Sequence, residues 1–381
     1  MAKRSKRRGR GEGSITKRAD GRYMARLQVD GERRAVYGDT REEAARGLRR
    51  LQEARDKALP VPDGRETVET FITDWLASEA NRLRPTTHTR YETLMRLHVI
   101  PTLGAVRLVK LTPHEVQRLY DERSASGLSP TTVHHIGAVL HKALEQAMRW
   151  GKVFRNVCDL VDAPPIRRTD IRTLSADEAR RFLACAHNDR FHPLYVVALT
   201  TGMRQGELLA LRWRDVSLDK CTLQVRGTLH WTKGGGFRVD EPKTKSSRRL
   251  IQLTDDAVEA LRRQRVRQNG ERLLSGKFWE DHGFVFSNHV GRPTDPANLV
   301  RRSFKPLLKV AEVSDIRFHD LRHTAATLLL EQGVHVKYVS EMLGHSSIAI
   351  TLDLYSHVTP SMHHEAKQTM QRIFSAGGGG Q

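Results

Sequence analysis

Residues 319–355, HDLRHTAATLLLEQGVHVKYVSEMLGHSSIAITLDLY, decide the fold of the C-terminal part of this chain. His319 and Arg322 stand three positions apart, so a helix through them places both side chains on one face. An apolar helical run follows, and Gly333 is the residue expected to end it. A second short helix is predicted to end at Gly344, after which the chain continues either as a helix or as an extended segment.

Four side chains of this stretch suit attack on a phosphodiester. Arginine offers a planar pair of donors to phosphate oxygens, histidine exchanges a proton near neutral pH, and tyrosine can form a covalent intermediate. The candidates are His319, Arg322, His345 and Tyr355. The alternative is a helix-turn-helix divided at Gly333, with histidines that lie at the surface or in the core.

The composition indicates a nucleic-acid partner. The chain has 381 residues, with 64 Lys and Arg against 44 Asp and Glu, which gives a formal charge of +20. Such a charge favours a polyanion, and the 38% of hydrophobic residues is enough for folded cores. The sequence has no long apolar span, signal peptide or lipidation motif, so we expect no membrane association. Its 3 cysteines form no motif, which suits a reducing cytoplasm.

The N-terminal part is predicted to be a small sheet with one helix. Residues 1–10 form a basic, flexible tail that would lie along DNA phosphates, or would act only as a solubilising tail. Alternating apolar residues over 23–29 indicate a strand, and an Asp-Gly turn leads into a return strand over 35–37. Thr40 then starts a capped helix, so residues 11–58 are predicted to form one domain.

An all-helical domain is predicted over 66–152, after a linker at 59–65 that contains proline and glycine. Amphipathic spacing marks its helices, and Thr112 and Ser129, each followed by proline, mark two helix starts. Its basic residues form either a DNA-facing surface or a solvated face. The proline-containing stretch 153–171 is predicted to be an extended linker.

The last domain, 172–375, is predicted to be mostly helical with a small β-sheet. Gly202 permits a sharp break, and Arg204 stands at the start of the next helix. Glu207, one turn further, could orient that arginine, or could complement the helix dipole as a first-turn acid. A C-terminal helix is predicted over 361–374.

Strands are expected in this domain at 249–253 and, briefly, at 284–286. The stretch 242–249, PKTKSSRR, precedes the first of them as a basic hairpin that could reach into a DNA groove. Lys243 and Lys245 both fit a position in this hairpin.

Six side chains in a fixed order carry a family resemblance. They are Arg204 in TTGMRQGELLALRW, Lys245 in the basic hairpin, His319 and Arg322 in HDLR, His345 in LGHSS and Tyr355 in YSH. This ordered set resembles the tyrosine recombinase family, specifically the integrases of phages and integrative elements. The spacing to the strand at 249–253 favours Lys245 over Lys243 as the lysine of that set.

The resemblance covers most of the chain and implies an α+β multidomain fold. Residues 11–58 are similar to an arm-type DNA-binding domain, 66–152 to a core-DNA-binding domain, and 172–375 to a catalytic domain. The resemblance implies a site-specific DNA recombinase that integrates or excises a phage or mobile element in the cytoplasm of a bacterial host. Its partners would be double-stranded attachment sites, with a tetramer on DNA and accessory DNA-bending and excision proteins.

The mechanism of that family implies a role for each residue. Tyr355 would attack the scissile phosphate and form a 3′-phosphotyrosyl link, leaving a free 5′-hydroxyl. Arg204 and Arg322 would clamp the nonbridging oxygens, and His345 would donate to the same phosphate. The phosphotyrosyl link keeps the bond energy, so no cofactor is implied. The sequence also has no acidic triad or Cys/His cluster that would suggest a metal.

Lys245 would protonate the leaving 5′-oxygen, and His319 would assist as a base or as a hydrogen-bond partner of the tyrosine. Two other classes compete with this interpretation. A type IB topoisomerase-like enzyme would use the same site without strand exchange, but it has little use for the additional N-terminal domain. A DNA-binding regulator would use the helix-turn-helix-like segment, but it leaves the ordered set unexplained.

Overall fold

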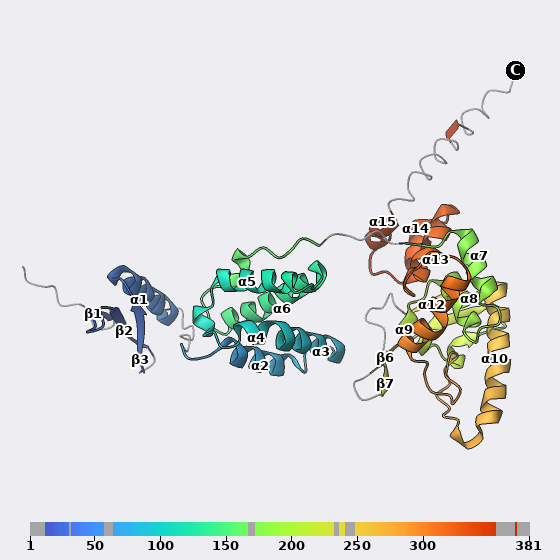
Figure 1. Cartoon of the computed structure of the whole chain (residues 1–381), viewed down its shortest axis with the longest axis horizontal. Helices are drawn as coiled ribbons and strands as arrows, with labels where there is room; N and C mark the ends of the chain where they lie inside the picture. The colour runs from blue at the N-terminus through green and yellow to red at the C-terminus, as the bar shows by residue number, and fades with distance from the viewer. Residues whose placement is uncertain are drawn as a thin grey trace, which may run out of the picture. The chain divides into compact units, whose positions relative to one another are not determined.

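The computed structural model describes residues 12–29, 32–56, 64–166, 172–231, 236–240, 248–355 and 370–371 (Figure 1). The chain divides into two compact units, Met1–Arg168 and Thr169–Gln381. The basic tail, the Asp-Gly turn, the hairpin lysines Lys243 and Lys245, and nearly all of the predicted C-terminal helix lie outside the described residues. In the described part, no helix is both long and apolar enough to cross a membrane.

The N-terminal part is a three-stranded antiparallel sheet with one helix, α1 (Arg41–Asp56), packed on one face. Ala25 and Leu27 stand two residues apart on the middle strand, so they share a face, and they pack with Leu48 and Leu51 of α1. The strands, in order across the sheet, are β1 (Ser14–Lys17), β2 (Tyr23–Val29) and β3 (Glu32–Gly38).

Strand β1 was not predicted from the sequence. Only Ile15 of its four residues packs on this core, so the strand carries little alternation, and its pairing with β2 defines it. The predicted start of α1 is confirmed. The Glu43 N–H donates to Oγ1 of Thr40 at 3.2 Å, and the Glu43 carboxylate accepts from the Thr40 N–H at 3.4 Å.

Residues 64–166 form an all-helical part around Phe71 and Trp75, which are both fully buried. The two predicted helix starts are confirmed, because the side chains of Thr112 and Ser129 accept hydrogen bonds from N–H groups of the first turn. The helices are α2 (Val68–Glu79), α3 (Pro85–Leu94), the π-helical turn η1 (Met95–Val99), α4 (Ile100–Leu103), α5 (Pro113–Ala125) and α6 (Pro130–Arg149).

The beginning of the predicted linker at 153–171 belongs to this helical part. A 3₁₀ turn, η3 (Val157–Leu160), follows α6, and Val157 and Cys158 are buried in the helical core. Burial raises the pKa of the Cys158 thiol to about 12, so this cysteine is an unreactive core residue. The linker prediction is wrong here because a turn that buries two side chains has no periodic sequence pattern.

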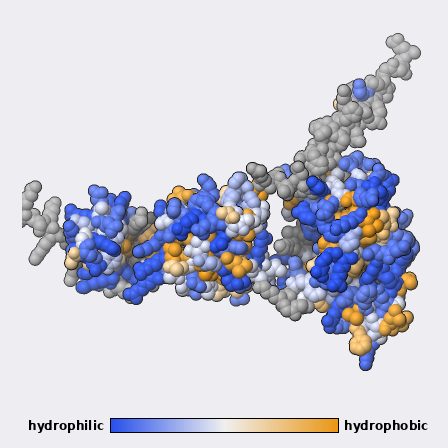
Figure 2. Space-filling model, in the orientation of Figure 1, coloured by the Kyte–Doolittle hydropathy of each residue, from blue (hydrophilic) through white to orange (hydrophobic). Residues whose placement is uncertain are grey.

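The described residues from 172 onward pack around an apolar core that contains a cluster of aromatic rings. Phe182, Tyr195 and Phe304 contact one another, and Phe318 contacts both Tyr195 and Phe304. The prediction of a mostly helical part with small sheets is confirmed. Hydrophilic residues cover most of the visible face (Figure 2).

This part combines its helices with small antiparallel strands. The helices are α7 (Ala176–Cys185), α8 (His192–Thr201), α9 (Gln205–Ala210), α10 (Asp255–Ser275), α11 (Pro296–Leu299), α12 (Lys305–Val310), α13 (Asp320–Glu331), α14 (Val336–Leu343) and α15 (Ile348–Tyr355). The strands are β4 (Val216–Ser217), β5 (Thr222–Val225) and β8 (Arg249–Gln252) in one sheet, and β6 (Thr228–Trp231) and β7 (Phe237–Asp240) in a second. The strands β6 and β7 lie at the edge of the unit near α9 (Figure 1).

The strand predicted at 284–286 is wrong. Phe284 makes only an isolated bridge with Arg212, although all three residues of the stretch are buried. Side chains of α10 take the place of a neighbouring strand, because Gln264 and Gln268 donate to the carbonyl oxygens of Val285 and Phe284 at 2.7 and 2.8 Å. An apolar run alone does not distinguish a strand from a loop that is held by side chains.

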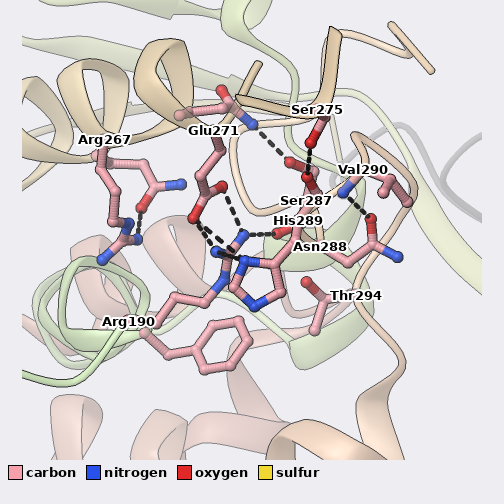
Figure 3. A network of polar contacts seen from close by, with 12 residues as sticks. Arg190, Arg267, Glu271, Ser275, Ser287, Asn288, His289, Val290 and Thr294 are labelled. Atoms are coloured by element: carbon pink, nitrogen blue, oxygen red, sulfur yellow. Dashed lines mark hydrogen bonds and ion pairs between the residues drawn. The ribbon is translucent and has the colours of Figure 1, made fainter. Parts of the chain in front are cut away.

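A network of polar contacts holds the start of α8 (Figure 3). Arg190 forms an ion pair with Glu271 of α10, donates to the Ser287 carbonyl at 2.7 Å, and lies 3.0 Å from Nδ1 of His289. Ser275 donates to the His289 carbonyl at 2.7 Å, which ties the same loop to the end of α10. The network therefore holds the N-terminal end of α8, whose C-terminal end is capped by Gly202.

Candidate active site

A sharp turn at Gly202 brings two of the predicted arginines together. Helix α8 ends there in the left-handed conformation, with a φ of +60°. The left-handed conformation favours glycine, and a Cβ at this position would lie 2.5 Å from Cδ2 of Leu343 and would have to displace that methyl group. The Gly202 carbonyl accepts a 2.9 Å hydrogen bond from Nη1 of Arg322, and Arg204 is the N-cap residue of α9.

Glu207 orients Arg204, as one of the two sequence interpretations predicts. Its Oε1 accepts from Nη1 of Arg204 at 2.8 Å, and its Oε2 accepts from the Arg204 N–H at 3.0 Å. Burial alone would raise the pKa of Glu207, but the guanidiniums of Arg249 and Arg204 and their hydrogen bonds outweigh it and lower that pKa. The side chain is therefore a carboxylate at neutral pH.

Arg249 is a further member of the site that the sequence analysis missed. Its Nη2 donates to Oε2 of Glu207 at 2.9 Å, and its Nε donates to the carbonyl oxygen of Met342, near the end of α14. Arg249 is the last residue of the basic stretch 242–249, which contains Lys243 and Lys245, and it begins β8. One buried guanidinium thus ties this strand to α9 and α14.

The sequence contains a signal that could have found Arg249. The residues of β8 alternate between buried and exposed, and Arg249 stands on the buried side with Ile251. An arginine on the inward face of a strand requires a buried carboxylate or carbonyl as its acceptor. The sequence pattern therefore predicts that Arg249 has a buried acceptor but does not identify that acceptor.

Helix α13 begins with a pair of imidazoles next to Arg322, whose side chain is buried. His319 is the N-cap residue, and its ring centroid lies 5.2 Å from that of His323. Burial first, and then the charges of Arg322 and Arg204, lower the pKa of His319. Burial and the neighbouring His319 lower the pKa of His323, which the sequence analysis did not single out, to about 4.

His345 follows the left-handed residue Gly344, which ends α14 as predicted. Burial, together with the charges of Arg322 and Arg204, lowers the pKa of His345 to about 4. Its imidazole is therefore uncharged at neutral pH. The Nδ1 of His345 lies 2.8 Å from Oγ1 of Thr351 in α15.

Four of the predicted site residues therefore share one electrostatic environment, since the same two arginines lower the pKa of both histidines. They are Arg204, His319, Arg322 and His345. Tyr355 is the last residue of α15, which answers the open question of helix or extended segment in favour of helix. The lysine candidates Lys243 and Lys245 lie outside the described residues.

The charges of this site suit an anion. Guanidinium groups and uncharged imidazoles offer hydrogen-bond donors to phosphate oxygens, and the imidazoles can also accept a proton. Across the described ranges, no three His, Cys, Asp or Glu side chains are grouped so that they could hold a metal ion. The arrangement can stabilise the extra negative charge that develops on a phosphate under attack.

Replacing Glu207 by alanine is expected to destabilise this unit and to disorder Arg204. Breaking a buried ion pair costs roughly 3–5 kcal/mol, which corresponds to a fall in unfolding temperature on the order of 10 °C for a unit of this size. Calorimetry of the full chain should show this shift for the C-terminal unit and no shift for the helical part.

Glu341→Ala, the same change at an exposed position of α14, is the matched control and should leave the unfolding temperature unchanged. Glu207→Gln keeps the shape and one acceptor, so its loss should be smaller. Equal unfolding temperatures for Glu207→Ala and Glu341→Ala would contradict the structural role of the shared carboxylate.

An all-helical part followed by a unit that gathers arginines and neutral imidazoles is the arrangement expected of an enzyme that acts on phosphodiesters. The model described as the Phage integrase family matches residues 172–362, and the model of the phage integrase N-terminal SAM-like domain matches residues 67–123. The chain belongs to the phage integrase family. Its members are tyrosine recombinases, and DNA strand cleavage and rejoining is the activity of the family.

Relatives match nearly the whole chain. An integrase of Streptomyces ambofaciens is 33% identical over 392 residues, which cover 98% of this chain and 99% of that protein. A protein named tyrosine recombinase XerC-like, from Caldanaerobacter subterraneus subsp. tengcongensis, is 30% identical over 361 residues, which cover 90% and 92% of the two chains. Neither match carries the name of a regulator or of a topoisomerase.

The fold is also that of a solved integrase. The structure of the Tn1549 transposon integrase in complex with transposon right end DNA superposes with a TM-score of 0.69. It is 23% identical, and the match covers 81% of this chain and 99% of that chain. The α+β multidomain fold expected from the sequence is therefore confirmed.

Proposed function

We propose that this chain is a site-specific integrase that cuts and rejoins DNA at the attachment sites of a phage or mobile element, through a 3′-phosphotyrosyl intermediate. One observation carries the proposal for the site: the turn at Gly202, two residues before Arg204, accepts a 2.9 Å hydrogen bond from Arg322, and the charges of these two arginines add to burial in lowering the pKa of both His319 and His345. Two cations beside two neutral imidazoles form a site for a phosphate that gains negative charge during reaction.

In the proposed reaction, the phenol oxygen of Tyr355 forms a bond to phosphorus while the bond from phosphorus to the 5′-oxygen breaks. His319 takes the phenol proton, which a neutral imidazole can accept. Arg204, Arg322 and His345 donate to the nonbridging oxygens. The phosphotyrosyl ester keeps the bond energy, so a 5′-hydroxyl of another strand can reverse the reaction.

The leaving 5′-oxygen needs a proton, because an alkoxide is a poor leaving group. We assign this proton to Lys245, with Lys243 as the alternative in the same basic stretch. The placement of Arg249 supports a role of that stretch at the site, because Arg249 is its last residue and donates to the carboxylate that orients Arg204.

Strand exchange sets the proposed assembly. Two duplexes contribute four strands to be cut, and each chain contributes one nucleophile, so four chains act together on DNA. Accessory DNA-bending and excision proteins would select the direction of the reaction. Since the substrate is the genome of a bacterial cell, we place the reaction in the cytoplasm.

The separate cores of the N-terminal parts support the proposed division of DNA recognition. Residues 11–58 would bind arm-type sites, the helical part 66–152 together with the turn η3 would bind the core site, and 172–375 would carry out catalysis. The arm-type part has its own small core, which includes Ala25 and Leu48.

A covalent-trapping experiment tests the proposal. The full chain is incubated with nicked DNA that carries candidate attachment sites, and the product is denatured in detergent. The expected result is a protein–DNA adduct joined to the 3′-phosphate end at the cut, with a free 5′-hydroxyl on the other fragment and with the modified peptide containing Tyr355. An adduct at another residue would overturn the site assignment, and the lack of any adduct on a DNA that the chain recombines would overturn the mechanism.

A chain that begins at residue 64 is expected to cleave core-type DNA at nearly the normal rate but to fail in integration on a full attachment site. The reason is that residues 12–56 fold around a core of their own, separate from that of the helical part. Integration assays on core-only and full sites measure the difference. A chain that begins at residue 12 is the control, since it lacks only the basic tail. Equal integration by the chains that begin at 64 and at 12 would refute a separate DNA site.

A further inference from the structure

Helix α15 buries a polar residue and exposes apolar ones. Thr351 is 0% exposed, whereas Ile348, Ile350 and Leu352 are 39%, 38% and 45% exposed. A helix that docks by hydrophobic burial alone shows the opposite pattern. Thr351 therefore buries a hydroxyl, and a buried hydroxyl needs a hydrogen-bond partner.

The hydroxyl of Thr351 lies on the imidazole of His345. The distance from Oγ1 to Nδ1 is 2.8 Å, well within hydrogen-bonding range. His345 belongs to the short segment between α14 and α15, while Thr351 stands one helical turn before the end of α15 at Tyr355. The contact thus connects a proposed phosphate-binding residue to the helix that carries the proposed nucleophile.

A neutral imidazole has one N–H, and the partner of one ring nitrogen decides where that hydrogen lies. If the threonine hydroxyl donates to Nδ1, the hydrogen is on Nε2 and can be donated to a phosphate oxygen. If Nδ1 carries the hydrogen, Nε2 presents a lone pair to the phosphate and repels it. Only the first state performs the task proposed for His345.

The surroundings of the ring favour a neutral state in which this choice matters. The charged groups that act on His345 include Arg322 on α13, Arg204 before α9 and Arg249 on β8, and His323 of α13 is a further titratable neighbour. Burial comes first, and these charges add to it, so both disfavour a second proton on the ring. The neutral imidazole, which has one N–H, therefore predominates at neutral pH.

We infer that Thr351 is a positioning residue whose hydroxyl donates to Nδ1 of His345 and holds the ring as the Nε2–H tautomer for the reacting phosphate. The inference rests on the proposed function, since it extends the role given there to His345. It also implies that the hydrogen bond sets how α15 sits beside the anion site.

Two variants separate the hydroxyl from the shape of the side chain. Thr351→Val keeps the shape and removes the hydroxyl, and Thr351→Ser keeps the hydroxyl and removes the methyl group. Removing one oxyanion donor outright costs on the order of 10²–10³ in rate, so losing its fixed tautomer should slow adduct formation by Thr351→Val about 10-fold to 100-fold. Thr351→Ser should stay close to the unmodified chain, and DNA affinity should be unchanged in both.

The tautomer itself is measured by NMR on the full chain with ¹⁵N-labelled histidine, where the two ring nitrogens of each tautomer have distinct shifts. A His345→Gln sample identifies the His345 signals. The unmodified chain and Thr351→Ser should show Nε2–H, and Thr351→Val should show a mixture or Nδ1–H. Unchanged signals of the other histidines verify that each variant is folded.

Three results would overturn the inference. They are an Nδ1–H tautomer in the unmodified chain, a purely Nε2–H tautomer in Thr351→Val, and a Thr351→Ser variant as slow as Thr351→Val. The tautomer is read on protein without DNA, and it can be repeated in Tyr355→Phe. A failure of the proposed function would appear instead as the absence of an adduct at Tyr355, so the two failures are distinguishable.

Discussion

Replacing Tyr355 by phenylalanine is expected to abolish the covalent adduct while DNA binding remains. The substitution removes one oxygen atom, which is the atom proposed to form the ester with phosphorus, and no remaining group can take its place. The guanidiniums of Arg204 and Arg322 that would bind the phosphate are untouched. Adduct formation is measured on denaturing gels with nicked attachment-site DNA, and binding is measured by electrophoretic mobility.

Tyr338→Phe is the matched control, because Tyr338 is an exposed tyrosine of the neighbouring helix α14. It should form the adduct at the normal rate. An adduct of normal yield from Tyr355→Phe, or its loss from Tyr338→Phe, would mean that the nucleophile is wrongly assigned.

Lys245→Ala is expected to cleave ordinary DNA more slowly by about 10²–10⁴-fold, which is the usual contribution of a positioned general acid. A substrate with sulfur in place of the bridging 5′-oxygen should restore most of this rate. The leaving thiolate is the anion of a much stronger acid than an alcohol, so it departs without a proton. Single-turnover cleavage rates on the two substrates give the comparison.

The neighbouring residues provide the controls for this experiment. Lys243→Ala should cleave both substrates at nearly the normal rate. Arg204→Ala should be slow on both, because its proposed work is on the nonbridging oxygens. If Lys243→Ala is the variant that sulfur rescues, the two lysines must be exchanged in the assignment. If neither variant is rescued, the basic stretch only binds DNA and the general acid lies elsewhere.

Helix ends were the most predictable part of the fold, because a cap depends on residues within about one turn. Thr112 and Ser129 cap their helices as the sequence indicates, and Gly333 and Gly344 have positive φ values just beyond the ends of α13 and α14. The same locality explains why Glu207, one turn beyond Arg204, was recognised as its partner.

Contacts between distant segments were not predictable in the same way. The carboxylate that accepts from Arg249 lies 42 residues earlier in the chain, and the carbonyl that accepts from Arg322 lies 120 residues earlier. In the sequence, nothing distinguishes Thr351 from other helix residues, and only the structure shows its hydrogen bond with His345. The resemblance to a family identified the proposed catalytic residues from their order in the sequence. It did not identify the distant residues that hold them in place.

The turn at Gly202 affects when, during its synthesis, the chain becomes able to cut DNA. The Gly202 carbonyl accepts its hydrogen bond from Arg322, and Leu343 packs beside Gly202. The site around the two arginines therefore forms only after residues 322–343, which are synthesised much later, fold onto this turn. A ribosome-bound chain that has reached residue 300 already carries most of the positive charge that attracts DNA. It lacks Arg322 and the proposed nucleophile Tyr355. With Tyr355 in that proposed role, the order of the segments delays cutting until synthesis has passed residue 355.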